Sequence, residues 1–358
     1  MILKMATSIT ARALSPDEYT VGWICAIPDE LGPARAMLDE RHAPIESQPS
    51  YDDNIYILGS IGKHNIAIAC LPEYGVANAA TAAKSMQATF RSLRFGLMVG
   101  VGGGIPGTWN DIRLGDIVVS LPTEQGGGVI QYDMGRREKD GFRRIGSLNK
   151  PPTLLRSAIP NLRTERGLPK NLSRMVADAW KKDATADSDD DSGDEEENEW
   201  RYPGVGQDIL FKADFDHEDG LATCDACANQ EASVIERPAR KNTHPLVHYG
   251  NIASGNSVMK NAAQRDELAK KESVICFEME AAGLMDNLLV LFLSKLQWKI
   301  LISCSPCLVI RGISDYCDSH KNWQWQPYAA AVAAAYAKRL LLVIPPQAVA
   351  KLEPIWSK

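Results

Sequence analysis

The sequence lacks the long hydrophobic runs and the cysteine patterns that mark several classes of protein. No stretch reaches the roughly 20 apolar residues that a membrane-spanning helix needs. The first fifteen residues contain no apolar core of the length found in signal peptides. The eight cysteines are scattered through apolar segments, which is typical of reduced, buried cysteine and not of a disulfide framework. We therefore expect a soluble, cytoplasmic protein with no membrane partner.

An excess of positive charge is also missing. The formal net charge is −6, and nine acidic residues fall within the single segment 187–199. Without those nine, the 39 Lys and Arg residues outnumber the 36 remaining acidic residues by three. The rest of the chain is near neutral, so nothing indicates a nucleic-acid-binding surface. Because like charges repel and cannot be buried together, we expect a disordered acidic loop at 183–200.

Composition and length indicate a globular protein. The 45% hydrophobic and 23% charged residues match globular averages and exclude wholesale disorder or a collagen-like fibre. At 358 residues, the chain fits one large domain with insertions or two domains, since single domains rarely exceed about 300 residues. We expect a flexible leader at 1–17, one domain at 18–345 and a tail at 346–358.

Short apolar runs alternate with helical patterns from Tyr19 onward, and a glycine-rich loop at 100–104 follows one of the runs. Such strand–loop repeats indicate a mostly parallel sheet with its ligand site at the strand ends. The pattern predicts strands at 19–27, 54–58, 65–71, 95–99, 116–121, 247–254, 274–277 and 307–313, and helices at 28–38, 76–92, 153–162, 172–182, 257–271, 281–287 and 327–342.

The segment 287–306 fits this pattern poorly. It inserts an apolar stretch between a predicted helix and the strand that should follow it. We treat it as an atypical insert, which is either an extra core element or a translated intron. It also separates two acidic motifs on which the functional argument depends.

Acidic residues stand at the ends of three predicted strands: Asp29 and Glu30, then Glu278 and Glu280, and finally Asp315. Each alone has an ordinary structural explanation. Glu30 suits the first turn of a helix, where the dipole favours an acid, and Asp315 suits an N-cap. The three together, with small or glycine-rich neighbours, indicate a functional site.

The surrounding motifs resemble those of the purine nucleoside phosphorylase/uridine phosphorylase superfamily, and in particular its fungal branch. The likeness spans about residues 19–342. It rests on WICAIPDE at 23–30, VGVGGGIP at 99–106, LGDIVV at 114–119, ASGN at 253–256, FEMEA at 277–281 and RGISD at 311–315. The resemblance implies a single-domain α/β fold, a twisted mixed β-sheet flanked by helices, interrupted by the disordered acidic insert.

The resemblance implies cleavage of the N-glycosidic bond of a nucleoside. Asp315 would donate a proton to N7 of a purine leaving group, a role that burial of the carboxyl would favour by keeping it protonated. Glu280 would accept hydrogen bonds from the ribose 2′ and 3′ hydroxyls, and Met279 would pack against the sugar. Pyrimidine-specific relatives lack an acid at the position of Asp315, so a small-molecule purine nucleoside of the adenosine type is favoured as substrate.

The remaining pocket residues follow from the same resemblance. Ser257, Val258 and Met259, together with Phe277, would sandwich the base. The implied substrate-binding set is completed by Val101, Gly102, Gly103, Glu278 and Ser314.

The nucleophile is predicted from two departures from the phosphorylase pattern. Phosphorylases hold phosphate with an Arg at the start of the glycine motif and a Ser or Thr three residues later, but Met98 and Val101 stand at those positions. An apolar pair cannot neutralise a phosphate dianion. Glu30 matches the acid with which hydrolytic members, similar to methylthioadenosine/S-adenosylhomocysteine nucleosidase, activate water. Hydrolysis is favoured; the alternative is phosphorolysis, with Arg35 or Arg311 reaching phosphate as co-substrate.

A metal site has weaker support in the sequence. Cys224 and Cys227 form a single C-x2-C pair with His217, His244 and His248 nearby, and such a set can ligate zinc. The pair can equally be two loop thiols without metal. We expect no metal and no cofactor.

One rival hypothesis belongs to another functional class. Fungal relatives are often joined to signalling domains, so the chain could be a catalytically weak nucleoside sensor. No such domain follows before Lys358, and the intact Glu30, Glu280 and Asp315 favour an enzyme. Many relatives share pocket residues across a dimer, so we expect a homo-oligomer.

Overall fold

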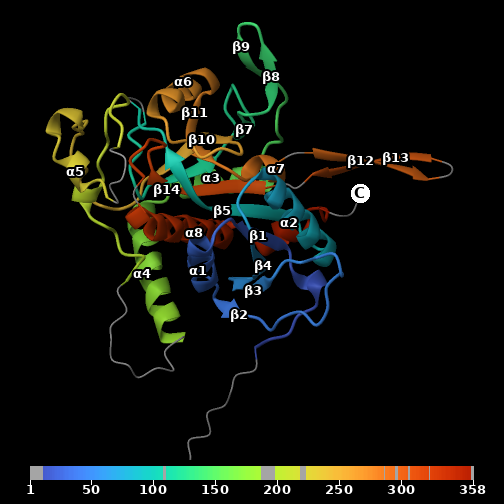
Figure 1. Ribbon diagram of the computed structural model, residues 1–358. Helices are drawn as coiled ribbons and strands as arrows, with labels where there is room; N and C mark the ends of the chain where they lie inside the picture. The colour runs from blue at the N-terminus through green and yellow to red at the C-terminus, as the bar shows by residue number, and fades with distance from the viewer. Residues whose placement is uncertain are drawn as a thin grey trace, which may run out of the picture.

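A ten-stranded mixed β-sheet forms the centre of the computed structural model (Figure 1). The structure describes residues 11–107, 110–186, 198–217, 223–285, 287–294, 297–304, 307–321 and 323–355. Nine strands lie in the order β11-β10-β6-β14-β5-β1-β4-β3-β2, and β7 pairs with β10. Their bounds are β1 Val21–Cys25, β2 Glu40–Arg41, β3 Tyr56–Ile61, β4 His64–Cys70, β5 Phe95–Gly104, β6 Ile117–Ser120, β7 Val129–Gln131, β10 Val247–Ser254, β11 Val274–Glu278 and β14 Cys307–Asp315.

Strand β5 takes part in a closed circuit of strands. It pairs in parallel with β1 and β14, and its last two residues pair antiparallel with Cys276 and Phe277 of β11. Because β14 also pairs with β6, β6 with β10 and β10 with β11, these five strands return to their starting point. Parallel and antiparallel pairs are therefore mixed, and the predicted α/β fold with a mixed sheet is confirmed.

Helices cover the sheet, and the alanine-rich α8 contacts both β5 and β14. Helix α8 packs directly against the backbone of β14, because a Cβ on Gly312 would lie 1.8 Å from the Ala329 carbonyl oxygen. Within the described residues, no helix combines the length and the hydropathy needed to cross a membrane. The helices are α1 Pro28–Ala36, α2 Val76–Thr89, α3 Thr153–Arg163, α4 Leu168–Ala186, α5 Asp225–Ala228, α6 Ala262–Glu272, α7 Ala281–Met285, α8 Gln326–Val343 and α9 Pro346–Ala350.

The predicted glycine loop at 100–104 is wrong, because these residues continue strand β5. Glycine is needed there for close approach and not for a turn. A Cβ on Gly100 would lie 2.0 Å from the Glu30 carboxylate, and one on Gly103 would lie 2.1 Å from Cys317 Sγ. The glycines thus let side chains from neighbouring segments reach the strand.

Three predicted irregular segments are partly ordered. Residues 183–186 of the predicted acidic loop belong to α4, and 187–197 lie outside the described residues. In the predicted leader, the Ser15 side chain caps a short helix, Pro16–Glu18, and Arg12 bridges to His42; residues 1–10 are not described. In the predicted tail, α9 forms and the Ile355 amide donates to the Leu93 carbonyl at 2.8 Å. The folded body extends beyond 18–345 at both ends.

The atypical segment forms a hairpin of its own. Strands β12 (Asn287–Ser294) and β13 (Gln297–Cys304) pair with each other in a separate two-stranded sheet, which projects from the body in Figure 1. It adds no strand to the main sheet, and β14 keeps its place beside β5. A second separate hairpin consists of β8 (Gly135–Glu138) and β9 (Gly141–Arg144).

Candidate functional site

One cavity of about 350 Å³ lies where β5, β11 and β14 end and α1 begins, a size typical of ligand pockets (about 300–1,000 Å³). All the site residues predicted from sequence line it. They come from five segments that are distant in the sequence. The lining includes Glu30, Val101, Gly102, Gly103, Ser257, Val258, Met259, Phe277, Glu278, Met279, Glu280, Ser314 and Asp315.

Glu30 is held in the first turn of α1 with its carboxylate turned inward. Only 3% of the residue is exposed. One oxygen accepts from the Ala26 amide at 2.6 Å and the other from the Val101 amide at 2.9 Å. Burial raises the pKa of Glu30, and the nearby Arg311 and these amides partly offset the effect. Each oxygen keeps a lone pair for a further donor.

Arg311 is the cation at the centre of three carboxylates. Its residue is fully buried on β14, and its Nη2 donates to both Glu278 and Glu280, to the latter at 2.9 Å. Its Nη1 lies 3.7 Å from Glu30. One positive charge therefore faces three acids; Nη1 also donates to the Val101 carbonyl at 3.3 Å, whereas Nε has no hydrogen-bond partner among the described residues. The sequence analysis considered Arg311 only as a possible phosphate ligand.

Glu280 also has a raised pKa. Burial raises its pKa to about 7, with Arg311 opposing and Glu278 and Glu30 adding to the shift. Its Oε1 accepts from the Gly75 amide at 3.3 Å. Glu278 serves the local fold instead: its carboxylate accepts from the Glu280 and Ala281 amides at the start of α7.

Asp315 lies at the last residue of β14. Its Oδ1 accepts from the Cys317 amide at 2.9 Å, which fixes the carboxyl, and its Oδ2 lies 3.6 Å from Lys321 Nζ. Cys317 adopts a left-handed backbone with φ of 57°, so the chain turns sharply directly after the acid. Lys321 also lies over the Trp323 ring, 5.3 Å from its centre.

The predicted helix at 257–271 begins later, and this correction concerns the cavity. Asn261 caps α6 by accepting from the Gln264 amide at 2.9 Å, so 257–260 form a loop. Ser257, Val258 and Met259 thereby line the cavity together with Phe277. Tyr132 packs edge-on against Phe277, with ring centres 5.5 Å apart.

The structure adds lining residues that the sequence analysis missed: Ala26, Ile27, Tyr74, Lys260, Cys317, Lys321 and Gln326. Most of them follow a strand end by a few residues, which is the one signal that could have identified them. Trp323 lines the cavity and is 64% exposed, whereas Trp325 is fully buried.

The positions compared with a phosphate site offer no charged side chain. Met98 is fully buried inside β5, and Val101 presents an aliphatic side chain. Arg35 pairs with Asp183 of α4 at 2.9 Å. Among the described lining residues, the basic side chains are Lys260 and Lys321.

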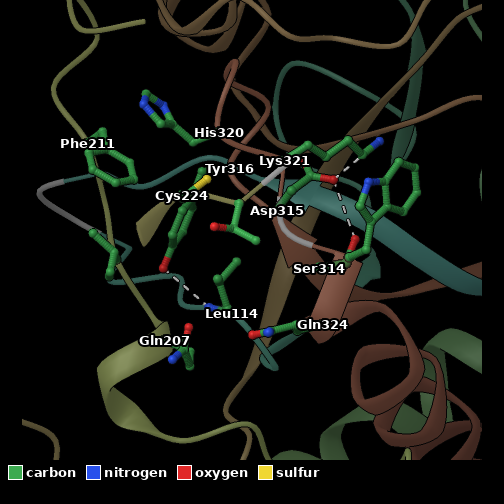
Figure 2. Close-up of a pocket in the computed structure, with 13 residues that line it drawn as sticks. Leu114, Gln207, Phe211, Cys224, Ser314, Asp315, Tyr316, His320, Lys321 and Gln324 are labelled. Carbon is green, nitrogen blue, oxygen red and sulfur yellow. Dashed lines mark hydrogen bonds and ion pairs between the residues drawn. The ribbon is translucent and has the colours of Figure 1, made fainter. Parts of the chain in front are cut away.

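A second cavity of about 160 Å³ adjoins the first (Figure 2). The two share Ser314, Asp315, Lys321 and Trp323. Its far wall is formed by Phe211, Cys224 and His320, which close this side of the site.

Another buried carboxylate, Asp116, belongs to a different environment. It accepts from Arg240 at 2.6 Å, from the Arg113 amide at 2.9 Å and contacts His248 Nε2 at 2.9 Å. Burial alone would raise its pKa, but the hydrogen bonds and charges of Arg240 and His248 lower it overall. The Asp116 amide also donates to the Arg113 carbonyl at 3.0 Å across a turn.

Comparisons with known proteins show the fold and one close relative. No family model matches the chain. It is 53% identical over 342 residues to a nucleotide-binding leucine-rich repeat (NLR)-like protein of Hyaloscypha variabilis, covering 96% of this chain and 31% of that protein. The chain thus spans about a third of the length of this relative.

Solved nucleosidase structures share the architecture at low sequence identity. The futalosine hydrolase of Helicobacter pylori superposes with a TM-score of 0.51 at 15% identity over 90% of this chain and 97% of that one. The 5′-methylthioadenosine/S-adenosylhomocysteine nucleosidase of the same organism gives the same values. Its counterpart from Neisseria meningitidis gives 0.50 at 16% identity, covering 90% and 98%. The chain therefore has the fold of these nucleosidases.

Proposed function

We propose that this protein hydrolyses the N-glycosidic bond of a purine nucleoside, releasing the free base and the sugar. The observation that carries the proposal is the convergence of Glu30, Glu280 and Asp315 on one cavity. The fold neighbours are named as nucleosidases acting on futalosine and on 5′-methylthioadenosine or S-adenosylhomocysteine, which supports nucleosides as the substrate class.

Glu30 is proposed as the general base. A water oxygen forms the new bond to C1′ of the sugar while its proton passes to the Glu30 carboxylate. The Ala26 and Val101 amides hold that carboxylate in place. Because burial raises the pKa of Glu30, the group is a stronger base than a solvated carboxylate once it is ionised.

Asp315 is proposed as the general acid. As the C1′–N9 bond breaks, its electron pair passes into the purine and the Asp315 proton is transferred to N7. Nucleoside and water thus become base and sugar, and the protons on Glu30 and Asp315 re-equilibrate through solvent. Lys321 Nζ, 3.6 Å from Asp315 Oδ2, is the cation beside this carboxyl.

Glu280 and Arg311 are proposed to support the sugar. Glu280 would accept from the 2′ and 3′ hydroxyls, while Arg311 fixes its orientation through the contact at 2.9 Å. Developing positive charge on the sugar is favoured by a cluster that contains three acids and one cation. The reaction as proposed uses no cofactor.

Water is favoured over phosphate as the nucleophile because the arginines considered as phosphate ligands are paired with carboxylates. Arg311 is committed to three carboxylates, and Arg35 to Asp183. A phosphate dianion in the cavity would meet buried acids and only Lys260 and Lys321 as countercharges among the described lining. Phosphorolysis is the alternative outcome of the test below.

The test is base release from adenosine, inosine, guanosine and 5′-methylthioadenosine in phosphate-free buffer, repeated with phosphate. We expect release without phosphate, with free sugar as product. Release that requires phosphate and yields a sugar 1-phosphate would replace hydrolysis by phosphorolysis.

Two variants test the assigned roles. Asp315→Asn and Glu30→Gln should each lower kcat by about 10²–10⁴-fold, the usual contribution of a general acid or base, while nucleoside binding is retained. Glu40→Gln, at an exposed carboxylate of β2, is the matched control and should leave kcat unchanged. Full activity of Asp315→Asn would remove Asp315 from the mechanism.

A second candidate function is nucleoside sensing within a larger assembly. It is favoured by the 53% identical relative, which is named as an NLR-like protein and is about three times longer than the matched region. Tight nucleoside binding by calorimetry, with no base release under any condition, would support this candidate over the enzyme. A homo-oligomer also remains a proposal, and sedimentation of the purified chain measures it.

A further inference from the structure

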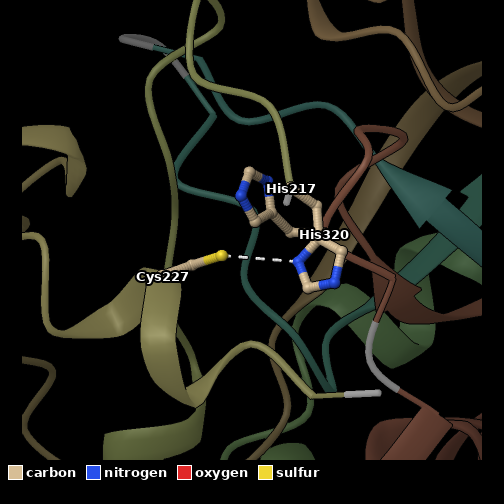
Figure 3. A group of neighbouring side chains, drawn as sticks. All are labelled: His217, Cys227 and His320. Carbon is tan, nitrogen blue, oxygen red and sulfur yellow. Dashed lines mark hydrogen bonds between the residues drawn. The ribbon is translucent and has the colours of Figure 1, made fainter. Parts of the chain in front are cut away.

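Four side chains capable of binding metal meet beside the site, at the junction between residues 198–246 and the loop after β14. His217, Cys227 and His320 bring their ligand atoms within 4.8 Å of one another (Figure 3). Cys224 lies next to them, with its Sγ 3.8 Å from His217 Nδ1. The sequence analysis selected the two cysteines and His217 but missed His320, which follows them by about 100 residues.

Two distances from His217 match those of a tetrahedral zinc site. With Zn–S near 2.3 Å and Zn–N near 2.0–2.1 Å, a sulfur and a nitrogen on adjacent corners of a tetrahedron lie about 3.5 Å apart. The separations from His217 Nδ1 are 3.4 Å to Cys227 Sγ and 3.8 Å to Cys224 Sγ. One distance is slightly shorter and the other slightly longer than the nitrogen–sulfur separation expected around a shared zinc ion.

His320 provides an independent sign of a missing ligand. The residue is 6% exposed, and within the described part of the chain neither of its ring nitrogens has a hydrogen-bond partner. Its ring stacks on Phe211, with ring centres 3.9 Å apart, and Phe215 lies beside both rings, 5.3 Å from His320 and 5.7 Å from Phe211. Its Nδ1 lies 3.9 Å from Asp318 Oδ1, beyond hydrogen-bonding distance. Buried polar atoms are normally hydrogen-bonded, so a buried imidazole with neither nitrogen hydrogen-bonded points to a ligand.

The other two histidines considered from sequence are engaged elsewhere. His244 Nδ1 contacts Ser173 Oγ at 3.0 Å, and His248 contacts Asp116. The segments that carry the four remaining groups are already joined, because the His217 amide donates to Ser319 Oγ at 2.9 Å. This tertiary contact thus brings the segment of His217, Cys224 and Cys227 to His320.

We propose that Cys224, Cys227, His217 and His320 form a structural zinc site. Two thiolates and two imidazoles are a ligand set that favours Zn²⁺ over Mg²⁺ or Ca²⁺, and four protein ligands leave no open position for catalysis. The ion joins the segments around His217 and Cys227 to the loop that follows Asp315 and carries Lys321. It lies outside the proposed reaction and acts by holding the second cavity's wall against the end of β14.

The primary test is the metal content of the full-length chain, expressed with added zinc and purified without chelators. We expect about one zinc per chain by elemental analysis. The double variant Cys224→Ser/Cys227→Ser should retain less than about a tenth of that amount. Cys70→Ser, at a part-buried thiol on β4, is the matched control and should keep the full zinc content.

A spectroscopic test uses the wild-type chain, so its result does not depend on whether the variants fold. Replacing zinc by Co²⁺ in the wild-type chain should produce a thiolate-to-cobalt charge-transfer band and the visible bands of a tetrahedral site, and a chelator should lower the wild-type Tm. A zinc-free wild-type chain that binds no Co²⁺ in this way would overturn the proposal. So would a disulfide between Cys224 and Cys227 in freshly alkylated protein, since it removes both thiolates.

Discussion

Two buried acidic clusters in this molecule differ in their charge balance. At the cavity, three glutamates share the single guanidinium of Arg311. At Asp116, one carboxylate is shared by Arg240 and His248 and is further bonded by backbone amides. Burial is strong in both places, yet the pKa of Glu280 rises to about 7 while that of Asp116 falls.

The difference separates a site that can exchange protons from one that only holds the fold. Where acids outnumber cations, the last carboxylate to ionise does so near neutral pH, as general acid–base chemistry requires. Where a buried carboxylate pairs with an arginine and accepts backbone amides, as Asp116 does, its pKa is lowered and it contributes a fixed ion pair. Counting charges around a buried acid therefore indicates function better than its burial alone.

The largest effect should come from removing the cation of the acid-rich cluster. Arg311→Met leaves three buried carboxylates without their partner, so we expect a loss of about 3–5 kcal/mol in the free energy of unfolding, measured by urea denaturation. Arg240→Met should cost less, because its side chain is partly exposed. Equal losses for the two variants would contradict the contrast between the clusters.

The next largest effects should separate the free energy of unfolding from kcat in two variants. Asp116→Asn should lower the free energy of unfolding by about 2 kcal/mol, as expected for lost charged hydrogen bonds, and leave kcat of the folded protein unchanged. Glu280→Gln should do the reverse, with kcat falling at least about 100-fold and stability nearly retained. Denaturation curves and base-release rates of both variants test this. If fully folded Asp116→Asn lost activity, the assignment of Asp116 to stability alone would be wrong.

A smaller effect is expected in the pH dependence of stability. Glu280 has a pKa of about 7 in the folded protein and about 4.3 when unfolded, so the folded state binds more protons between these values. Its contribution to stability is present below about pH 4 and is lost as pH rises through 7, on the order of 1–3 kcal/mol. Asp116 acts oppositely, since its lowered pKa gives stability that is lost only in acid.

The measurement is the free energy of unfolding from pH 4 to 8 for wild type and Glu280→Gln. The variant should show a flatter decline between pH 5 and 7. An unchanged slope would mean that another group carries the titration.

The smallest effect should arise at the rim of the cavity, away from both clusters. Trp323 is largely exposed and lies beside Lys321. Trp323→Ala should raise KM several-fold through lost contact with the base or sugar, and change the free energy of unfolding by less than about 0.5 kcal/mol. Steady-state kinetics and denaturation separate the two; a large loss of stability would assign Trp323 to the core instead.

Local signals in the sequence predicted much of the fold and the positions lining the cavity. The run that forms β10 has the bounds expected from its apolar pattern, and the acids Glu30, Glu280 and Asp315 follow strand ends as predicted. These features depend on neighbours along the chain. The glycines at 100–104 were misassigned because their reason is the approach of Glu30 and Cys317 from elsewhere.

The unpredicted parts depend on contacts between segments far apart in sequence. Arg311 reads locally as a strand residue, and only the fold brings it to three glutamates. His320 and Lys321 follow β14 in a turn that no periodicity describes, and their partners lie in other segments. A single sequence contains no direct signal for such pairs.

The closed circuit of strands has a consequence for the order of events during folding. Strand β5 must pair with β14 and β11, whose residues lie roughly 170–210 positions later in the chain. Such contacts carry a high loop-closure entropy and form slowly. The cavity therefore cannot exist in any partly synthesised chain that lacks β14, and nucleoside binding should be among the last properties gained on refolding. Acquisition of ligand affinity is accordingly a direct kinetic probe of complete folding.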